Sequence, residues 1–321
     1  QPKDTPNHTA APIAVLMNRG VDVEGDDQSN DDTAYIVTGS MPGRPANLTI
    51  SDLTGNTIFS TDPLGGNFTG GIRVATGDVN GDHIDDIVVT AGYGGGPRVQ
   101  VRDGLSFTIL SDTFFIENTF RGGYYAAVGD VNNDGFGDVI GSAGETGGPR
   151  VTIMDGFQLW NGTMTVIANF FAFESTLPNG GIVTSADVNG DGFYEVYVAP
   201  GQGGGPRVRG FDGYSVAHGN FNVTVMDAFV SDPAARYGVK IAIGTLAEPC
   251  GAKALIITPQ EGDPDVWVRL LNPIGGHQLA SSGFPVPPMK GADAAILPAF
   301  GGSLTPYVLT SGWFVTGDSV Q

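Results

Sequence analysis

Residues 70–104 read GGIRVATGDVNGDHIDDIVVTAGYGGGPRVQVRDG, and two later stretches repeat this pattern. Residues 122–156 read GGYYAAVGDVNNDGFGDVIGSAGETGGPRVTIMDG, and residues 180–213 read GGIVTSADVNGDGFYEVYVAPGQGGGPRVRGFDG. The first Asp of each acidic segment lies at position 78, 130 or 187, so the copies begin 52 and 57 residues apart. A fixed period of this length is typical of repeat architectures, in which each copy forms one supersecondary unit.

Weaker copies flank these three. Strand-like runs continue the rhythm after residue 236, and a degenerate copy precedes residue 70. We place five copies and a half-copy at residues 12–70, 71–121, 122–179, 180–236, 237–290 and 291–321. Residues 1–11 carry two prolines and no apolar period, which predicts an extended N-terminal arm before a single domain over residues 12–321.

Each copy contains four short strand-like runs separated by turn signals, such as 72–76, 87–90, 98–101 and 109–115. Four short strands per repeat of this length are typical of a propeller blade. We therefore predict an all-β fold, a β-propeller of four-stranded antiparallel blades. About six blades are expected, or five if the terminal strands share one, with an incomplete terminal blade. Asp-Gly pairs at 103–104, 155–156 and 212–213 predict tight hairpin turns.

The composition agrees with a β fold and limits the partners. The 50 glycines and 21 prolines among 321 residues disfavour a mostly helical protein. The net charge of −19 argues against a nucleic-acid partner, because phosphate binding requires a basic face. No run of 18 apolar residues occurs, so membrane insertion is not expected. Excess carboxylates indicate either a solubility device or cation sites.

The acidic segments have the donor pattern of calcium loops. Oxygen-bearing side chains stand at positions 1, 3, 5 and 9, and an apolar residue at position 7 would offer its backbone carbonyl while its side chain enters the core. Crowded carboxylates repel one another unless a cation lies between them, and calcium takes six to eight oxygens. We predict about three structural calcium ions. Their ligands would be Asp78, Asn80, Asp82, Ile84 and Asp86; Asp130, Asn132, Asp134, Phe136 and Asp138; and Asp187, Asn189, Asp191, Phe193 and Glu195.

The repeats resemble those of FG-GAP / VCBS repeat proteins, whose propellers include the head of integrin α subunits. Asp-Val-Asn-Gly-Asp at 78–82 matches the calcium loop of that family, whereas Gly-Gly at 70–71 replaces its Phe-Gly element. The Gly-Gly-Pro-Arg-Val pattern looks closest to multi-repeat bacterial surface proteins. The resemblance is strong over 70–236 and weak elsewhere. It implies a calcium-stabilised extracellular propeller, but it does not fix a ligand.

Other features leave alternatives open. Arg98, Arg150 and Arg207 recur after Gly-Gly-Pro, either as a ring that binds anions or acidic sugars or as a repeated salt bridge.

Cys250, the single cysteine, is expected to be a small buried residue, with an intermolecular disulfide as the alternative. Five Asn-x-Thr sequons predict glycosylation of a secreted chain: Asn7, Asn47, Asn67, Asn161 and Asn222.

These features predict a secreted or surface-exposed, non-catalytic module for adhesion, with a glycan or an extracellular protein as its ligand. One alternative is a structural subunit of an extracellular filament or surface layer that polymerises by strand exchange. A second is a polysaccharide-active enzyme such as a lyase, although the four histidines are scattered and no nucleophile elbow or phosphate loop occurs.

Overall fold

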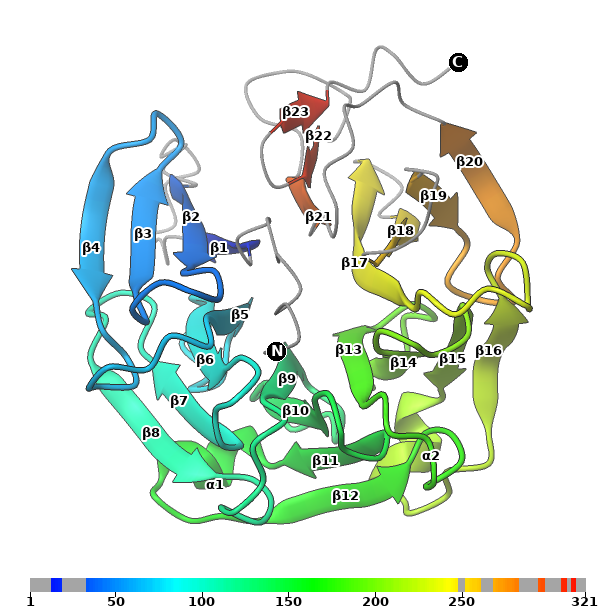
Figure 1. The fold of residues 1–321 in the computed structure, drawn as a ribbon, viewed down its shortest axis with the longest axis horizontal. Coiled ribbons are helices and arrows are strands. Elements are labelled where there is room, and N and C mark those ends of the chain that lie inside the picture. Colours follow the sequence, from blue (N-terminus) through cyan, green and yellow to red (C-terminus); the bar gives the residue numbers. More distant parts are fainter. Residues whose placement is uncertain are drawn as a thin grey trace, which may run out of the picture.

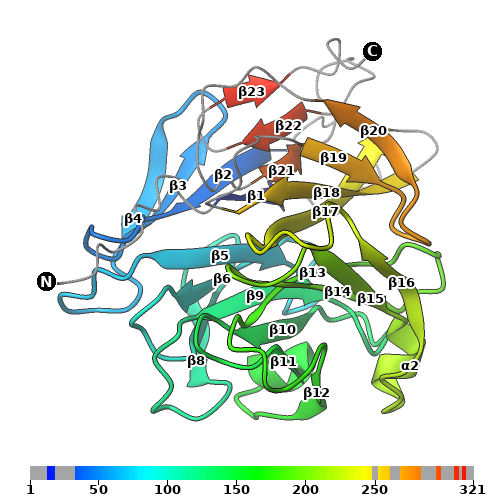
Figure 2. The same ribbon diagram turned by 45° about the vertical axis from the view of Figure 1, so that its right-hand side comes forward.

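Antiparallel sheets surround a common axis in the computed structural model of the chain (Figures 1 and 2). The structure describes residues 13–18, 33–247, 252–260, 268–282, 294–297, 307–310 and 313–315. The predicted N-terminal arm at 1–11 and Cys250 lie outside these residues. No helix in the described part of the chain is long and apolar enough to cross a membrane.

Five sheets contain four strands each, in chain order from the axis to the rim, and we number them blades 1 to 5. Their strands are β1 (Ile13–Asn18), β2 (Thr33–Gly39), β3 (Leu48–Asp52) and β4 (Thr57–Thr61); β5 (Ile72–Gly77), β6 (Asp86–Ala91), β7 (Arg98–Arg102) and β8 (Ile109–Phe114); β9 (Tyr124–Gly129), β10 (Asp138–Ala143), β11 (Arg150–Met154) and β12 (Val166–Phe171); β13 (Gly181–Ala186), β14 (Glu195–Pro200), β15 (Arg207–Phe211) and β16 (Thr224–Phe229); and β17 (Val239–Ala247), β18 (Ala252–Pro259), β19 (Val268–Leu271) and β20 (Gln278–Ser282).

The C-terminal half-copy forms a sheet of three strands, β21 (Ala294–Leu297), β22 (Tyr307–Thr310) and β23 (Trp313–Val315). The innermost strands contact one another around the axis, and β21 contacts both β17 and β1. The predicted propeller of four-stranded antiparallel blades is confirmed. The described residues form five complete blades, which matches the alternative prediction rather than the six blades preferred from the sequence.

The core lies between neighbouring blades. The second strands β6, β10 and β14 are buried along their whole length, because another blade covers each face. One cluster between blades 3 and 4 includes Ile140, Val151 and Val198, all fully buried. This packing fixes the position of the first residue of each second strand, which is also the last residue of an acidic loop.

Candidate metal centres

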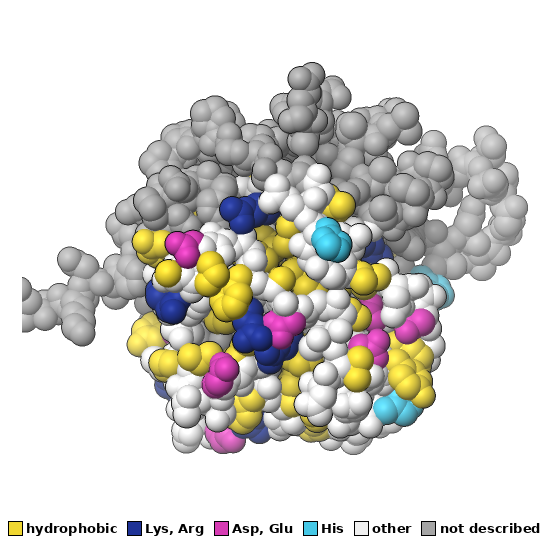
Figure 3. All heavy atoms as spheres, turned by 90° about the vertical axis from the view of Figure 1, so that its right-hand side faces the viewer, with side chains coloured by type: hydrophobic (Ala, Val, Ile, Leu, Met, Phe, Trp, Pro, Cys, Tyr) yellow, Lys and Arg dark blue, Asp and Glu magenta, His cyan; other side chains and the backbone are white. Residues whose placement is uncertain are grey.

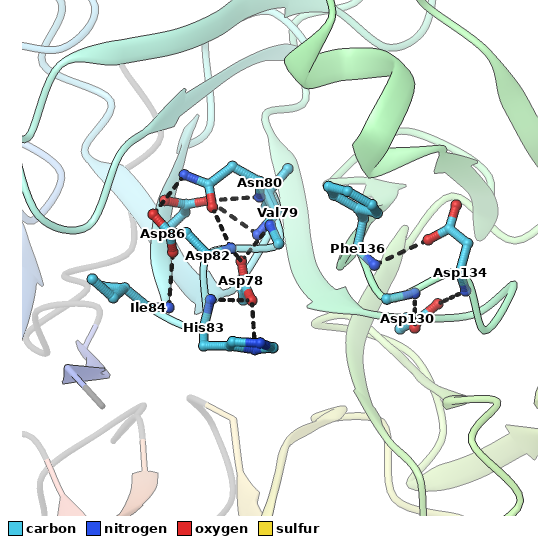
Figure 4. Close-up of polar contacts among 12 residues, drawn as sticks. Asp78, Val79, Asn80, Asp82, His83, Ile84, Asp86, Asp130, Asp134 and Phe136 are labelled. Carbon is cyan, nitrogen blue, oxygen red and sulfur yellow. Dashed lines mark hydrogen bonds and ion pairs between the residues drawn. The ribbon is translucent and has the colours of Figure 1, made fainter. Parts of the chain in front are cut away.

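The three acidic loops connect the first and second strands of blades 2, 3 and 4, and we name them loop 1 (78–86), loop 2 (130–138) and loop 3 (187–195). Loops 1 and 2 lie beside each other in Figure 4. The backbone links neighbouring loops, since Gly137 N donates to Asp78 O at 2.6 Å and Tyr194 N donates to Asp130 O at 2.9 Å. The candidate sites therefore form a connected row along one end of the propeller.

The Asp at position 1 organises each loop by accepting bonds from its backbone. In loop 1, Asp78 Oδ1 accepts from Gly81 N at 2.7 Å. Asp78 Oδ2 accepts from His83 N at 2.8 Å (Figure 4). Asp130 accepts from the amides of positions 5 and 6, and Asp187 from those of positions 4 and 6. The chain thus curls around this carboxylate in all three loops.

Positions 3 and 5 turn toward each other in the same way. Asn80 Nδ2 donates to Asp82 Oδ2 at 3.0 Å, and Asp82 Oδ1 accepts from Ile84 N at 2.8 Å. The corresponding Asn–Asp distance is 3.0 Å in loops 2 and 3 as well. The side chain at position 7 was expected in the core. Ile84 is buried, whereas Phe136 and Phe193 are only half-buried.

The carboxylate at position 9 is fully buried in each loop, at Asp86, Asp138 and Glu195. Asp86 Oδ2 accepts from Val79 N at 3.0 Å, and Asp86 Oδ1 accepts from Gly104 N at 3.0 Å. Asp138 has the same two kinds of partner. Position 9 therefore joins the start of its loop to the turn between the third and fourth strands, a role that the sequence reading missed.

Loop 3 departs from this geometry because Glu195 is one methylene longer than Asp. Its Oε1 lies 3.5 Å from Gly213 N, a longer contact than in loops 1 and 2, and it also accepts from Asn189 Nδ2 at 3.2 Å. Position 3 therefore bonds to position 9 through its side chain in loop 3, whereas in loops 1 and 2 it does so through its backbone amide.

Burial raises the pKa of these carboxyl groups, and the neighbouring carboxylates of each loop raise it further, whereas the hydrogen bonds from backbone amides lower it by less. The pKa is about 7 for Asp86, about 8 for Asp138 and about 7 for Glu195. At neutral pH each loop therefore holds a buried acid that is close to its titration point. A bound cation would favour the ionised form.

These pKa values predict how the stability of metal-free protein depends on pH. A carboxyl whose pKa is raised by folding stabilises the protein below its unfolded pKa, and this contribution is lost as the pH rises through the folded value. In excess chelator, the melting temperature should fall by roughly 10 °C between about pH 5 and pH 8. Scanning calorimetry across this range measures the effect, and a flat or rising profile would contradict it.

The prediction of tight hairpin turns at the Asp-Gly pairs is wrong at two of the three pairs. Asp155 and Asp212 are not in hairpin turns but cap two short helices, α1 (Gly156–Trp160) and α2 (Gly213–Ala217). Gly104, Gly156 and Gly213 do not have positive φ angles. Glycine is needed because a Cβ at Gly156 would lie 2.1 Å from Gly137 O, and a Cβ at Gly104 would lie 2.0 Å from Asp85 O. The absent side chain lets the Gly amide reach the carboxylate at position 9.

Two positions in each loop have left-handed backbone geometry. Position 6 is Gly135 (φ 88°) in loop 2 and Gly192 (φ 89°) in loop 3, but it is His83 (φ 67°) in loop 1. Glycine adopts this region without the steric cost that other residues carry. The His83 side chain is largely exposed, and its nearest carboxylate atom, Asp78 Oδ2, lies 3.9 Å from Nδ1.

His83→Gly should therefore stabilise the protein by about 1 kcal/mol, because relief of strain exceeds the loss of a long contact between an exposed imidazole and Asp78. Equilibrium unfolding in urea measures this change. Gly135→His is the matched reverse substitution and should cost a similar amount. Equal stability of His83→Gly and the parent protein would show that the loop relieves this strain elsewhere.

The recurrent arginines form ion pairs, which confirms the salt-bridge interpretation. Arg98 pairs with Asp112 at 2.6 Å, Arg150 with Glu117 at 3.0 Å, and Arg207 with Asp227 at 2.7 Å. The carboxylate of each pair offsets the positive charge of its arginine, so these arginines attract an anion less strongly than unpaired ones would. The side of the molecule that carries β16 and β20 shows the same mixture, with basic and acidic side chains next to each other (Figure 3).

The sequons differ in their surroundings. Asn67, Asn161 and Asn222 are exposed, whereas Asn47 is half-buried and bonds to Thr49 Oγ1 at 2.8 Å. Asn7 lies outside the described residues. Glycosylation at these five positions remains a prediction.

Residues 70–104, which include loop 1, match the family model of the FG-GAP repeat. The resemblance stated from the sequence is confirmed over this segment. No curated protein matches the chain by sequence.

Solved structures resemble this chain at low sequence identity. The C-terminal domain of Pseudomonas aeruginosa PilY1 has a TM-score of 0.55 at 10% identity, covering 96% of this chain and 83% of that one. The rhamnogalacturonan lyase PL11 of Bacillus licheniformis has a TM-score of 0.47 at 13% identity, covering 97% of this chain and 56% of that one. This chain thus spans little more than half the length of that lyase. The similarity to PilY1 shows the fold alone.

Proposed function

We propose that this chain is a secreted or surface-exposed, non-catalytic β-propeller that is stabilised by calcium and binds a glycan or an extracellular protein. The observation that carries the proposal is the threefold recurrence of one donor arrangement in consecutive blades. An isolated acidic turn needs no ligand, but three loops that share their hydrogen bonds indicate a repeated requirement.

The residues present fit a calcium ion by the chemistry of their donors. Positions 1, 5 and 9 supply carboxylates, position 3 supplies an amide oxygen and position 7 supplies a carbonyl, all of which are hard oxygen donors. Within the described ranges, no three Asp, Glu, His or Cys side chains form a metal cluster by themselves. The Asn side chain and the backbone carbonyl are therefore necessary members of each proposed site.

Calcium would supply positive charge beside the buried acid of each loop. The side chains at positions 1, 3 and 5 would hold the ion, and the carboxylate at position 9 would balance it from the core side. Position 9 is already bonded to the turn after the third strand, so the ion would join three strands of a blade. This role is structural, and it leaves the rest of the surface for a ligand.

Calorimetry on chelator-stripped protein tests the metal assignment, and three binding events are expected. Asp78→Ala, Asp130→Ala and Asp187→Ala should each remove one event. Asp232→Ala, in an exposed turn outside the loops, is the matched control. Absence of calcium binding would overturn the proposal, whatever the ligand.

A glycan array and an array of extracellular proteins test the binding role in the presence of calcium. Specific retention of a glycan or a protein is the expected result. Turnover of a polysaccharide, lost on substitution of a single side chain, would instead establish an enzyme.

The three-stranded sheet favours a second candidate, a subunit that assembles by strand exchange. Among the described residues, no fourth strand pairs with β23, so its outer edge can accept a strand from another chain. Light scattering separates the candidates, because a filament subunit gives polymers and a binding module gives particles of defined mass.

A further inference from the structure

Three aromatic rings on and beside loop 2 form a group that we call the aromatic ledge, in which Phe136 is half-buried and Phe157 and Trp160 are exposed. Phe136 and Phe157 meet edge to face with centroids 4.9 Å apart, and Phe136 and Trp160 are stacked at 6.2 Å. Phe157 is 38% exposed and Trp160 is 46% exposed. Rings that pack together but keep this much surface in water are candidates for a binding role.

Contacts with loop 1 and the N-cap of α1 hold the rings of the aromatic ledge in place. The ring of Phe136 lies against Gly81 of loop 1, where a Cβ would be only 2.6 Å from it. Phe157 and Trp160 belong to α1, which Asp155 caps by accepting from Gln158 N at 2.9 Å. The rings therefore have a defined position across the boundary between blades 2 and 3.

A sequon lies at the edge of this ledge. Asn161 directly follows Trp160 and ends α1, and its Nδ2 donates to Phe157 O at 2.8 Å. Residues four apart lie on the same side of a helical turn, so the Asn161 amide leaves the backbone on the side of Phe157. Glycosylation replaces one of the two amide hydrogens, and the other can keep this bond. No heavy atom lies within 4 Å of a Cβ built on the next residue, Gly162, so the approach is open.

We propose that the first N-acetylglucosamine of a glycan on Asn161 packs on the aromatic ledge, an inference that rests on the secreted location in the proposed function. The C–H groups of a pyranose face carry partial positive charge, and the face of an aromatic ring carries partial negative charge. Attachment at Asn161 gives the sugar a high effective concentration at the rings. The glycan covers the exposed rings and braces α1 against loop 2.

The sequon at Asn222 provides an internal control. It also follows an aromatic residue, but Phe221 is half-buried and stacks on Phe170 with centroids 4.5 Å apart. That ring already has a partner inside the protein. A glycan on Asn222 is therefore expected to add no comparable contact.

The test uses the full chain secreted from a eukaryotic host, with site occupancy read by mass spectrometry. Thr163→Ala removes the sequon at Asn161, and Thr224→Ala removes that at Asn222. Loss of the Asn161 glycan should lower the melting temperature by about 2 °C, and loss of the Asn222 glycan should leave it unchanged. Endoglycosidase trimming to a single N-acetylglucosamine should preserve the stabilisation, because only the first sugar meets the rings.

The Trp160→Leu variant tests whether the indole ring causes the stabilisation by the Asn161 glycan. In this background, Thr163→Ala should cause no further loss of melting temperature. The proposal is overturned if Asn161 is unoccupied, or if its glycan stabilises Trp160→Leu as much as the parent protein. Calcium titration of the Thr163→Ala protein should still show three events, so failure of this proposal is distinct from failure of the metal assignment.

Discussion

Calcium added to chelator-stripped protein at neutral pH should raise its melting temperature by roughly 10 °C. A ligand at a hundred times its dissociation constant stabilises the folded state by about 2.7 kcal/mol per site, and three sites add to about 8 kcal/mol. For a chain of this length, each kcal/mol corresponds to roughly 1.5 °C. The effect is large because each ion balances a buried carboxylate whose pKa is near or above neutrality.

Single-loop variants make this expectation specific. Asp130→Ala should abolish about a third of the calcium-dependent increase, since it removes the carboxylate around which loop 2 curls. Asp232→Ala should retain the full increase. The increase should also be smaller at pH 5 than at pH 8, because protons compete with calcium for the same carboxylates. A melting temperature that does not respond to calcium in the parent protein would contradict the calcium assignment.

Gly156→Ala should destabilise the protein by about 3 kcal/mol, through a clash with rigid backbone and the loss of a buried hydrogen bond. The new Cβ would lie 2.1 Å from Gly137 O, which cannot move without shifting loop 2. The Gly156 amide would then leave Asp138 Oδ1, which it now meets at 3.0 Å. One added methyl group thus disturbs the core and the candidate site together.

Denaturant unfolding of Gly156→Ala beside Gly205→Ala measures this effect. Gly205 is the matched control, because its φ angle is ordinary and the nearest atoms to a built Cβ are 3.8 Å away. Gly205→Ala should leave stability unchanged or slightly higher. If both variants unfold at the same denaturant concentration, the close approach at Gly156 does not constrain the fold. Gly156→Ala should also weaken calcium binding at loop 2 while sparing loop 3.

The repeat period and the strands could be predicted from the sequence because both are local signals. The runs expected at 72–76 and 87–90 correspond to β5 and β6. The helices α1 and α2 could not be separated from hairpin turns by the same signals, since Asp-Gly suits a helix N-terminus as well as a turn. The length of the connection between the third and fourth strands determines whether a helix forms. This connection is long in blades 3 and 4, at residues 155–165 and 212–223, and short in blade 2, at residues 103–108.

The hydrogen-bond partners of the buried carboxylates at position 9 could not be predicted from local signals. Each buried carboxylate accepts from a glycine amide 18 residues later in the chain, a contact created by tertiary packing. The separation is the same in all three copies, so the spacing itself was a usable signal. The exposure of Phe136 could not be predicted, because it depends on how α1 lies beside loop 2.

The backbone bonds between neighbouring loops give the molecule an uneven response to mechanical force. Asp78 O and Asp130 O join blades 2, 3 and 4 in series, and each bond begins at a residue of a candidate site. The Asp-Val-Asn motif does not recur in the copy at 237–290, so this series of bonds between acidic loops ends at blade 4, and blade 5 is joined to it by other backbone bonds such as Gly238 N to Gly204 O. Under tension between its ends, the chain should yield first outside this series. Blades 2 to 4 should then hold as one tethered unit whose resistance increases with the calcium concentration of the medium.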